Sequence, residues 1–230
     1  MASVEDAKRR AVLKALQPIR SGWIIGLGSG STTAYALAEI ARLSRAKSFE
    51  LSVVPTSHQI ENLAISHGLR IKSMNEAHTV DYAIDGADQV EVPSLDVIKG
   101  GGAALLREKV VDSAAHKLAI VVDERKITKH LGDKQLIPLE VFPFAYRSVQ
   151  AKLTTMGARA RLRESDGKIG PVITDNGNFI LDADFGRLDN PSRLDRQPKM
   201  VPGLVETGLF LKMADRVYVG RSDGNVDVLK

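Results

Sequence analysis

One stretch of the sequence combines residue types that can do chemistry. It runs from Lys99 to Lys109 as Lys-Gly-Gly-Gly-Ala-Ala-Leu-Leu-Arg-Glu-Lys. Three consecutive glycines cost backbone entropy and pack no side chains, so such a run usually marks a tight turn or a close approach to a ligand. Residues 96–98 are typical of a strand end, and a helix is predicted from Ala103. Because α/β folds place ligands at such junctions, we expect Lys99 and the three glycines to bind one.

Glu108 is the only carboxylate in this stretch. On a helical wheel that starts at Ala103, it lies at the edge of an apolar arc. The arc consists of Ala104, Leu106, Val110, Val111, Ala114 and Ala115. A carboxylate half inside an apolar face can act as a proton-transfer base, whereas a solvated glutamate beside Lys109 would not; the sequence favours neither. Arg107 falls inside the arc, so either the helix starts elsewhere or this guanidinium has a buried acidic partner.

A second glycine-rich turn follows a predicted buried strand, within residues 22–33, and leads into a predicted helix over residues 34–43. A helix N-terminus preceded by Gly, Ser and Thr offers free N–H groups, hydroxyls and a positive dipole end, which suits a phosphate. The glycine spacing lacks the third position of the dinucleotide fingerprint, and no Gly-Lys-Ser/Thr follows as in Walker A. A terminal phosphate on a small metabolite remains, with a purely structural glycine turn as the alternative.

Asp85 and Asp88 flank a glycine turn at the carboxyl end of a predicted central strand, residues 80–85. Two carboxylates there can form an acid–base pair, a Mg²⁺ site or an Asx-type turn. The ligand interpretations gain weight because three glycine-containing tips follow strand-like segments, and in a parallel sheet such tips gather along one edge.

Lys126 follows another predicted buried strand, residues 117–122, within the run Asp123-Glu-Arg-Lys126. It could reach the same sheet edge as a cation for phosphate. A solvated charge cluster is the alternative for such a run.

The composition is that of a soluble globular protein, with 43% hydrophobic and 26% charged residues among 230. The absence of cysteine excludes disulfides, thiolate catalysis and cysteine-based zinc sites, and the five histidines show no metal-ligand pairing. A net charge of +4 without a basic stripe suits an anionic small molecule rather than nucleic acid. No apolar run has membrane-spanning length, so we expect a cytoplasmic protein with no membrane partner.

The pattern of elements predicts two domains in an α/β protein. Helices are also expected over residues 4–16 and 57–67, and strands over 51–54 and 69–71. The pattern of predicted elements changes after residue 132. Strand-like pieces, a helix over 146–156 and turns at Asp166-Gly167 and Asn176-Gly177 there indicate an α+β insert. After a helix over residues 191–197, the segment 215–220 is expected as an outer strand of the first sheet. We therefore expect a main domain of residues 1–132 and 205–230, and a small domain of residues 133–204.

Together these motifs resemble the type A ribose-5-phosphate isomerase family over nearly the whole chain. Gly26-Leu-Gly-Ser-Gly-Ser-Thr is similar to its phosphate loop, Asp85-Gly-Ala-Asp88 to its paired-aspartate loop, and Lys99 to Glu108 to its catalytic signature. Three later stretches also match: Leu139-Glu-Val-Phe-Pro-Phe-Ala, Thr174-Asp-Asn-Gly-Asn and Pro202-Gly-Leu-Val-Glu-Thr-Gly-Leu-Phe. Ser29 replaces a more usual Thr and keeps its hydroxyl, whereas Leu106 stands where a Thr is common.

The resemblance implies a Rossmann-like main domain with a mostly parallel sheet, and a smaller ferredoxin-like α+β domain. It implies an aldose–ketose isomerase of the pentose phosphate pathway, which interconverts D-ribose 5-phosphate and D-ribulose 5-phosphate through an enediolate without a cofactor or a metal. It also implies a homodimer or homotetramer.

The residues assigned to that chemistry follow from the matched motifs. Glu108 would shuttle the proton and Lys99 would stabilise the oxyanion, while Asp85 would assist ring opening and Asp88 would orient hydroxyls or Lys99. The expected substrate-binding residues are Ser29, Gly30, Ser31, Thr32, Asp85, Gly86, Ala87, Asp88, Lys99, Gly100, Gly101, Gly102 and Lys126. Two other classes stay open: an amino-sugar-phosphate isomerase/deaminase, and a sugar-phosphate sensor without catalysis.

Overall fold

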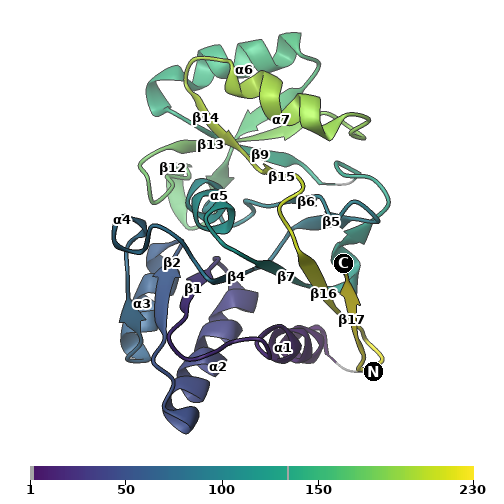
Figure 1. Ribbon diagram of the computed structural model, residues 1–230. Coiled ribbons are helices and arrows are strands. Elements are labelled where there is room, and N and C mark those ends of the chain that lie inside the picture. The colour runs from purple at the N-terminus through teal and green to yellow at the C-terminus, as the bar shows by residue number, and fades with distance from the viewer. Residues whose placement is uncertain (1–2, 134) are drawn as a thin grey trace. The chain divides into compact units, whose positions relative to one another are not determined.

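The computed structural model describes residues 3–133 and 135–230, which form two compact units (Figure 1). The first unit comprises Met1–Ala87, Arg107–Ile127 and Met213–Lys230, and the second comprises Asp88–Leu106 and Thr128–Lys212. The domain boundaries expected from the sequence put residues 88–106, 128–132 and 205–212 in the main domain. In the structure these residues group with the second unit, and the strands that they contain lie outside the seven-stranded sheet of the first unit.

A seven-stranded, mostly parallel sheet forms the centre of the first unit. Its order is β17-β16-β7-β4-β1-β2-β3, and only the β16–β17 pair is antiparallel. The strands are β1 (Ile24–Leu27), β2 (Ser52–Pro55), β3 (Arg70–Ile71), β4 (Tyr82–Asp85), β7 (Leu118–Asp123), β16 (Arg216–Gly220) and β17 (Val226–Leu229). The expected mixed α/β fold with a mostly parallel sheet is confirmed.

The strand predicted over residues 215–220 is present in this sheet as β16, but it is not the edge strand. β17 lies outside β16, with Val217 opposite Leu229 and Gly220 opposite Val226. The sequence analysis missed β17 because its four residues are all partly exposed, so they lack the continuous apolar run that identifies a buried strand.

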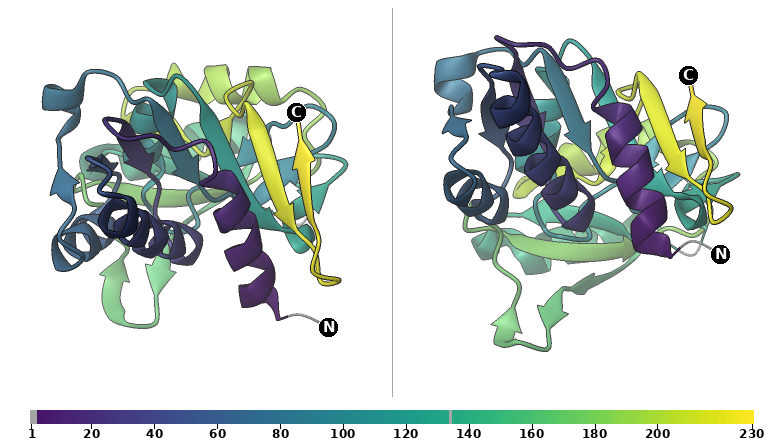
Figure 2. Two further views of the ribbon diagram at one scale, coloured as in Figure 1. Left: turned by 60° about the horizontal axis from the view of Figure 1, so that its bottom comes forward. Right: turned by 90° about the horizontal axis from the view of Figure 1, so that it is seen from below.

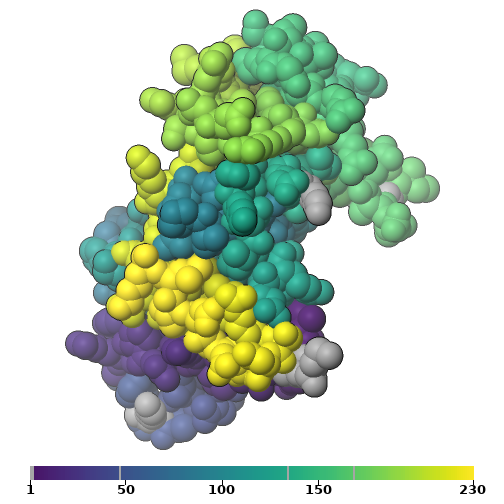
Figure 3. Space-filling view, turned by 90° about the vertical axis from the view of Figure 1, so that its right-hand side faces the viewer, coloured from purple at the N-terminus to yellow at the C-terminus, as the bar shows by residue number. Residues whose placement is uncertain are grey.

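Three helices pack on one face of this sheet: α1 (Val4–Ala15), α2 (Ser31–Lys47) and α3 (His58–Ser66). Figure 2 shows them on the same side of the strands. α1 starts at a capping box in which Ser3 and Asp6 satisfy each other's backbone N–H groups, and it ends before Pro18. Figure 3 shows the β16–β17 hairpin on the surface beside this N-terminal helix, where Lys14 Nζ donates to the Val226 carbonyl at 3.2 Å.

The helix α5 (Leu105–Ser113) starts two residues later than the sequence predicts, because Ala103 has a φ of +58° and interrupts the helix. The predicted apolar arc is therefore wrong, and Val110 in it is 46% exposed. The buried positions of the helix are Leu105, Glu108, Val111 and Asp112. Arg107, which the wheel had placed in that arc, is only half-buried. A short helix, α4 (Met74–Ala77), precedes β4.

The second unit contains a four-stranded antiparallel sheet in the order β10-β13-β9-β14, on which two helices pack. These elements are β9 (Ile137–Val141), α6 (Tyr146–Thr155), β10 (Arg159–Leu162), β13 (Phe179–Asp184), α7 (Pro191–Lys199) and β14 (Leu204–Thr207). A small sheet joins β15 (Leu209–Phe210), β6 (Val97–Ile98), β5 (Gln89–Glu91) and β8 (Ile127–Thr128). The hairpin of β11 (Glu164–Ser165) and β12 (Lys168–Pro171) and the short 3-10 turn η2 (Pro143–Ala145) complete this unit, and the 3-10 turn η1 (Glu124–Lys126) belongs to the first unit. Among the described residues, no helix is both long and apolar enough to cross a membrane.

Close packing of α1 on β16 gives a test of this arrangement. A Cβ added at Gly220 would lie 2.2 Å from the Ala7 carbonyl oxygen, so Gly220→Ala must push the helix away from the strand. We expect a loss of about 1–3 kcal/mol in the free energy of unfolding, measured by urea denaturation. Gly167→Ala is the control, because no atom lies within 4 Å of the added carbon there. Equal stability of the two variants would contradict the packing described.

Candidate active site

The carboxyl ends of β1 and β4 meet at one edge of the sheet of the first unit. Leu27 pairs with Ile84, and the Gly28 N–H donates to the Ile84 carbonyl at 3.0 Å. From β1 the strand order continues to β2 and β3, whereas from β4 it continues in the opposite direction to β7 and β16. The direction of the strand order therefore reverses between β1 and β4. Such a switch in strand order is where open α/β sheets bind ligands, and the first turn and Asp85 both lie there.

Asp85 is completely buried at this edge, at 0% exposure. Its Oδ1 accepts a hydrogen bond from the Gly86 N–H at 2.6 Å. A Cβ added at Gly28 would lie 1.8 Å from the same oxygen, so only glycine lets the carboxylate lie against the turn. Burial of a carboxylate costs free energy, so Asp85 is not an ordinary surface carboxylate.

Glu108 is also buried, at 4% exposure, so it is not the solvated helix glutamate that the sequence left open. Its Oε1 accepts the Ser29 N–H at 3.2 Å, across 79 residues of sequence. The Ser29 hydroxyl in turn shares a hydrogen bond of 2.9 Å with that of Thr56. The structure therefore brings Glu108 and Asp85 to the same glycine turn. Thr56, which follows β2, is a member of this group that the sequence analysis did not select.

The N-terminus of α2 forms the other part of this group. Gly30 caps the helix with a φ of +103° and without a side-chain hydrogen bond. Among the described residues, the N–H groups of Ser31, Thr32 and Thr33 have no hydrogen-bond acceptor. Their dipoles and N–H groups point to one place, which makes the helix end suited to an anion. A Cβ added at Gly86 would lie 4.0 Å from Thr32 Cβ, so the Asp85 turn also approaches this loop.

Two lysines could add positive charge to this helix end. Lys8 of α1 places its Nζ 3.5 Å from the Ser31 hydroxyl and 3.3 Å from a Glu5 carboxylate oxygen. Sequence reasoning missed Lys8, because it read only as part of the polar face of an amphipathic helix. Lys126 lies in η1, directly beyond the carboxyl end of β7, and makes no ion pair with the described residues.

Asp123, just before η1, forms an ion pair with Arg125. Burial acts to raise the pKa of Asp123, but the hydrogen bonds and charge of Arg125 outweigh it and hold that pKa below its usual value. The Arg125 Nε lies 2.7 Å from Asp123 Oδ1. Arg125 thus neutralises the carboxylate next to η1, and the Lys126 charge is left available to an anion.

The remaining predicted site residues belong to the second unit. Lys99 is 3% exposed, and its Nζ lies 5.4 Å from the centroid of the Phe210 ring. Its backbone N–H donates to the Gly208 carbonyl at 2.9 Å. Asp88 Oδ2 accepts the Gly101 N–H at 2.7 Å, so this aspartate fixes the glycine run. The structure thus brings Asp88, Lys99 and the glycines of residues 100–102 together within this unit.

Arg163 holds the other side of the glycine run, and the sequence analysis did not select it. Its Nη1 donates to the Gly100 carbonyl at 2.8 Å and to the Gly101 carbonyl at 3.0 Å. The same guanidinium forms an ion pair with Asp182 of β13. Gly100 has a φ of +105°, and a Cβ there would lie 2.7 Å from Leu105 Cδ2, so this position requires glycine.

The structure also bears on the three interpretations of the aspartate pair. Asp85 and Asp88 each accept a backbone N–H, from Gly86 and Gly101 respectively. Within residues 3–133 and 135–230, no three His, Cys, Asp or Glu side chains are grouped so that they could hold a metal ion.

The role of Arg163 can be tested against a neighbour on the same strand pair. Arg159 also pairs with an aspartate of β13, but its side chain is 89% exposed, whereas that of Arg163 is 15% exposed. Arg163→Ala leaves Asp182 unpaired and should cost roughly 3 kcal/mol in the free energy of unfolding. Arg159→Ala should cost less than about 1 kcal/mol. Amide hydrogen exchange at residues 99–102 should accelerate only in Arg163→Ala. Unchanged exchange there would contradict the role of Arg163 in holding the glycine run.

Comparisons with known proteins give a consistent answer. Residues 52–224 match the family model described as ribose 5-phosphate isomerase A (phosphoriboisomerase A). The chain is 48% identical to ribose-5-phosphate isomerase A of Methanothermobacter thermautotrophicus, over 95% of this chain and 96% of the relative. It is 41% identical to ribose-5-phosphate isomerase of Homo sapiens, over 99% of this chain and 74% of the human protein.

Solved structures agree with the sequence relatives. A D-ribose-5-phosphate isomerase in complex with phospho-erythronic acid superposes with a TM-score of 0.96 at 41% identity, over all of both chains. Ribose 5-phosphate isomerase A of Methanocaldococcus jannaschii gives a TM-score of 0.94 at 41% identity, over 99% of this chain and 100% of that one. The mixed α/β fold described above is that of these relatives.

Proposed function

The chain belongs to the ribose 5-phosphate isomerase A family, and from this premise we propose that it interconverts D-ribose 5-phosphate and D-ribulose 5-phosphate. The observation that carries the proposal is the buried Glu108 carboxylate at the Ser29 N–H, next to a helix N-terminus with open N–H groups. This pairs a candidate base with a candidate phosphate site. The pathway we assign is the pentose phosphate pathway, which this reaction serves.

The N-terminus of α2 binds the substrate phosphate. The N–H groups of Ser31 and Thr32 donate to its oxygens, and the hydroxyls of this loop add further donors. Lys8 and Lys126 supply the charge that a phosphate dianion requires. A related isomerase binds phospho-erythronic acid, a sugar acid that carries a phosphate, and the same class of ligand suits this group.

Glu108 moves the proton between the two carbons. After the sugar ring opens, the carboxylate takes the proton from C2 of the aldehyde, and the electrons of that bond form an enediolate with the C1 oxygen. The hydroxyl proton moves from O2 to O1, and Glu108 returns its proton to C1, which gives the ketose. Catalyst and substrate thus end with the same number of protons. The hydrogen bond from Ser29 orients the carboxylate for both transfers.

Lys99 and the glycine run stabilise the charge on the enediolate oxygens. The lysine is 3% exposed, and charge stabilisation is strong where water is excluded. Asp85 assists ring opening and the transfer between the hydroxyls, and Asp88 orients the glycine run through the Gly101 N–H.

We also propose the finer description of the fold. Counted in chain order, the first sheet has the order 3-2-1-4-5-6 from β3 to β16, which is that of the Rossmann fold. The second unit runs β9-α6-β10-β13-α7-β14, the β-α-β-β-α-β succession of ferredoxin-like domains. These orders support a Rossmann-like domain and a ferredoxin-like domain.

A homodimer or homotetramer is the assembly we propose. Phe144 is 94% exposed and Met200 is 82% exposed in the second unit, and an assembly that covers them would remove this apolar surface from water. Light scattering on the purified protein measures the mass. A monomer would contradict this part of the proposal.

An assay in EDTA tests the activity itself. Purified protein is mixed with ribose 5-phosphate in the presence of the chelator, and we expect ketose to form. Glucosamine 6-phosphate is the control substrate, from which we expect no ammonia. Ammonia release would indicate a deaminase instead, and binding of ribose 5-phosphate without ketose would indicate a sensor.

Glu108→Gln removes the proton shuttle but keeps the size of the side chain. We expect kcat to fall about 10²–10⁴-fold with little change in KM, because the base acts only in the proton transfers. Glu39→Gln on α2, where the glutamate pairs with Arg42 on the surface, is the control and should keep wild-type kinetics. Near-normal turnover of Glu108→Gln would remove this residue from its role.

Lys8→Ala and Lys126→Ala test the phosphate site. Each should raise KM roughly tenfold or more with a small effect on kcat, since a hydrogen bond to a charged group contributes about 1.5–3 kcal/mol. Lys129→Ala is the matched control, because this exposed lysine follows Lys126 by three residues. An unchanged KM would take the corresponding lysine out of the phosphate site.

A further inference from the structure

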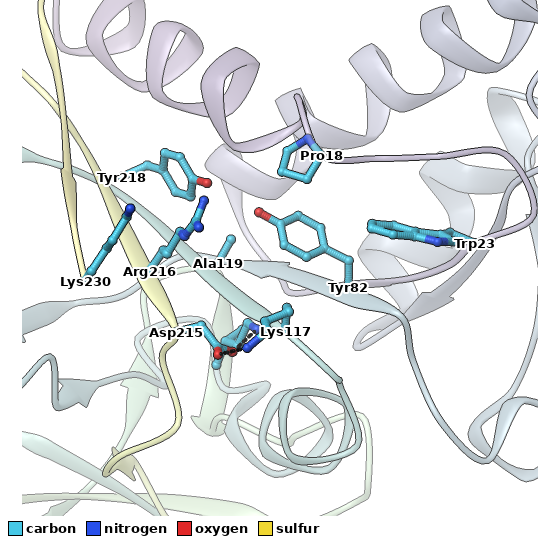
Figure 4. A pocket seen from close by; sticks show the side chains of 10 residues that line it. Pro18, Trp23, Tyr82, Lys117, Ala119, Asp215, Arg216, Tyr218 and Lys230 are labelled. Carbon is cyan, nitrogen blue, oxygen red and sulfur yellow. Dashed lines mark hydrogen bonds and ion pairs between the residues drawn. The ribbon is translucent and has the colours of Figure 1, made fainter.

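The first unit contains a pocket at the opposite edge of its sheet from the candidate active site (Figure 4). Tyr82, Leu118 and Arg216, the first residues of β4, β7 and β16, line it, whereas the site residues follow the last residues of such strands. Its volume is about 390 Å³. Small-molecule sites typically measure about 300–1,000 Å³. None of the residues assigned to the isomerase reaction lines this amino-edge pocket.

One wall of the amino-edge pocket is aromatic. The Trp23 and Tyr82 rings lie 6.1 Å apart between centroids, inclined by 41°, and Pro18 lines the pocket beside them. The Tyr82 hydroxyl donates to the Ala15 carbonyl at 2.9 Å. Burial raises the pKa of Tyr82, so the phenol stays neutral. This wall offers ring surface without negative charge.

The opposite wall is cationic. Lys117 and Asp215 neutralise each other at 2.7 Å. The side chains of Arg216 and Lys230, in contrast, form no ion pair or hydrogen bond with any described residue. Val217 pairs with Leu229 across the β16–β17 ladder, which sets Arg216 and Lys230 side by side at its end. Figure 4 shows both cations on the side of the pocket away from Trp23. Two uncompensated positive charges therefore face an aromatic wall.

We propose that the amino-edge pocket is a second ligand site, which binds a small aromatic phosphate monoester. The ring of the ligand packs against Trp23 and Tyr82, and its phosphate lies between Arg216 and Lys230. An arginine fork matches two phosphate oxygens at once, and a second cation balances the remaining charge of the dianion. The aromatic part recognises the planar ring, since stacked and edge-to-face rings attract each other.

Trp23 makes the proposal directly measurable, because it is the only tryptophan of the chain. Its fluorescence is followed while the full-length protein is titrated with phenyl phosphate. We expect a saturable change in emission. Phenol, which lacks the charge, and inorganic phosphate, which lacks the ring, should each need at least tenfold higher concentration for the same change. Ribose 5-phosphate should not displace the probe.

Two variants separate this pocket from general charge effects. Arg216→Ala should weaken phenyl phosphate binding at least tenfold. Arg70→Ala removes an exposed arginine from β3 of the same sheet, away from the pocket, and should leave the affinity within twofold. Circular dichroism confirms that each variant is folded. No saturable emission change, equal weakening in both variants, or displacement of the probe by ribose 5-phosphate would each overturn the proposal.

Discussion

The close approach of α5 to β1 is the contact on which the candidate base depends. Gly26 has no side chain, and a Cβ there would lie 2.6 Å from Val111 Cγ1, so the helix packs directly on the strand. Glu108 precedes Val111 by nearly one helical turn, and Ser29 follows Gly26 by three residues. The same packing that seats Val111 over Gly26 therefore brings the Glu108 carboxylate to the Ser29 N–H. A larger residue at position 26 would lift the base away from the turn.

The carboxylates of the first unit are buried at a cost in stability. Asp85, Glu108 and Asp112 are all less than 5% exposed. A carboxylate taken out of water must recover its hydration energy from hydrogen bonds or charges, and backbone N–H groups supply part of it here. An apolar residue would serve a purely structural core better. The burial of Asp85 and Glu108 next to the N-terminus of α2 therefore supports the proposal that these two carboxylates serve the reaction.

Not every motif of the sequence belongs to the site. The Thr174–Asn178 motif forms a turn whose side chains converge on Glu140, a fully buried residue of β9. Glu140 Oε1 accepts from the Thr174 hydroxyl at 2.9 Å, from Asn176 Nδ2 at 3.0 Å and from Asn178 Nδ2 at 2.9 Å. This network ties the turn to the sheet of the second unit. The Thr174–Asn178 motif, which matched the family, thus stabilises the second unit. Arg163, which belongs to no matched motif, holds the glycine run.

The sequence by itself determined the local features: the strand-to-helix turns, the glycine positions, the residues able to do chemistry and most of the elements. These follow from periodicity, turn residues and side-chain types, which act over a few residues. The tertiary structure alone decided that Glu108 is buried, that α5 starts at Leu105, and that Lys8, Thr56 and Arg163 join the two groups. Lys8 meets Ser31 across 23 residues, and Arg163 meets Gly100 across 63. Such contacts arise when distant segments pack together, and no short-range pattern records them.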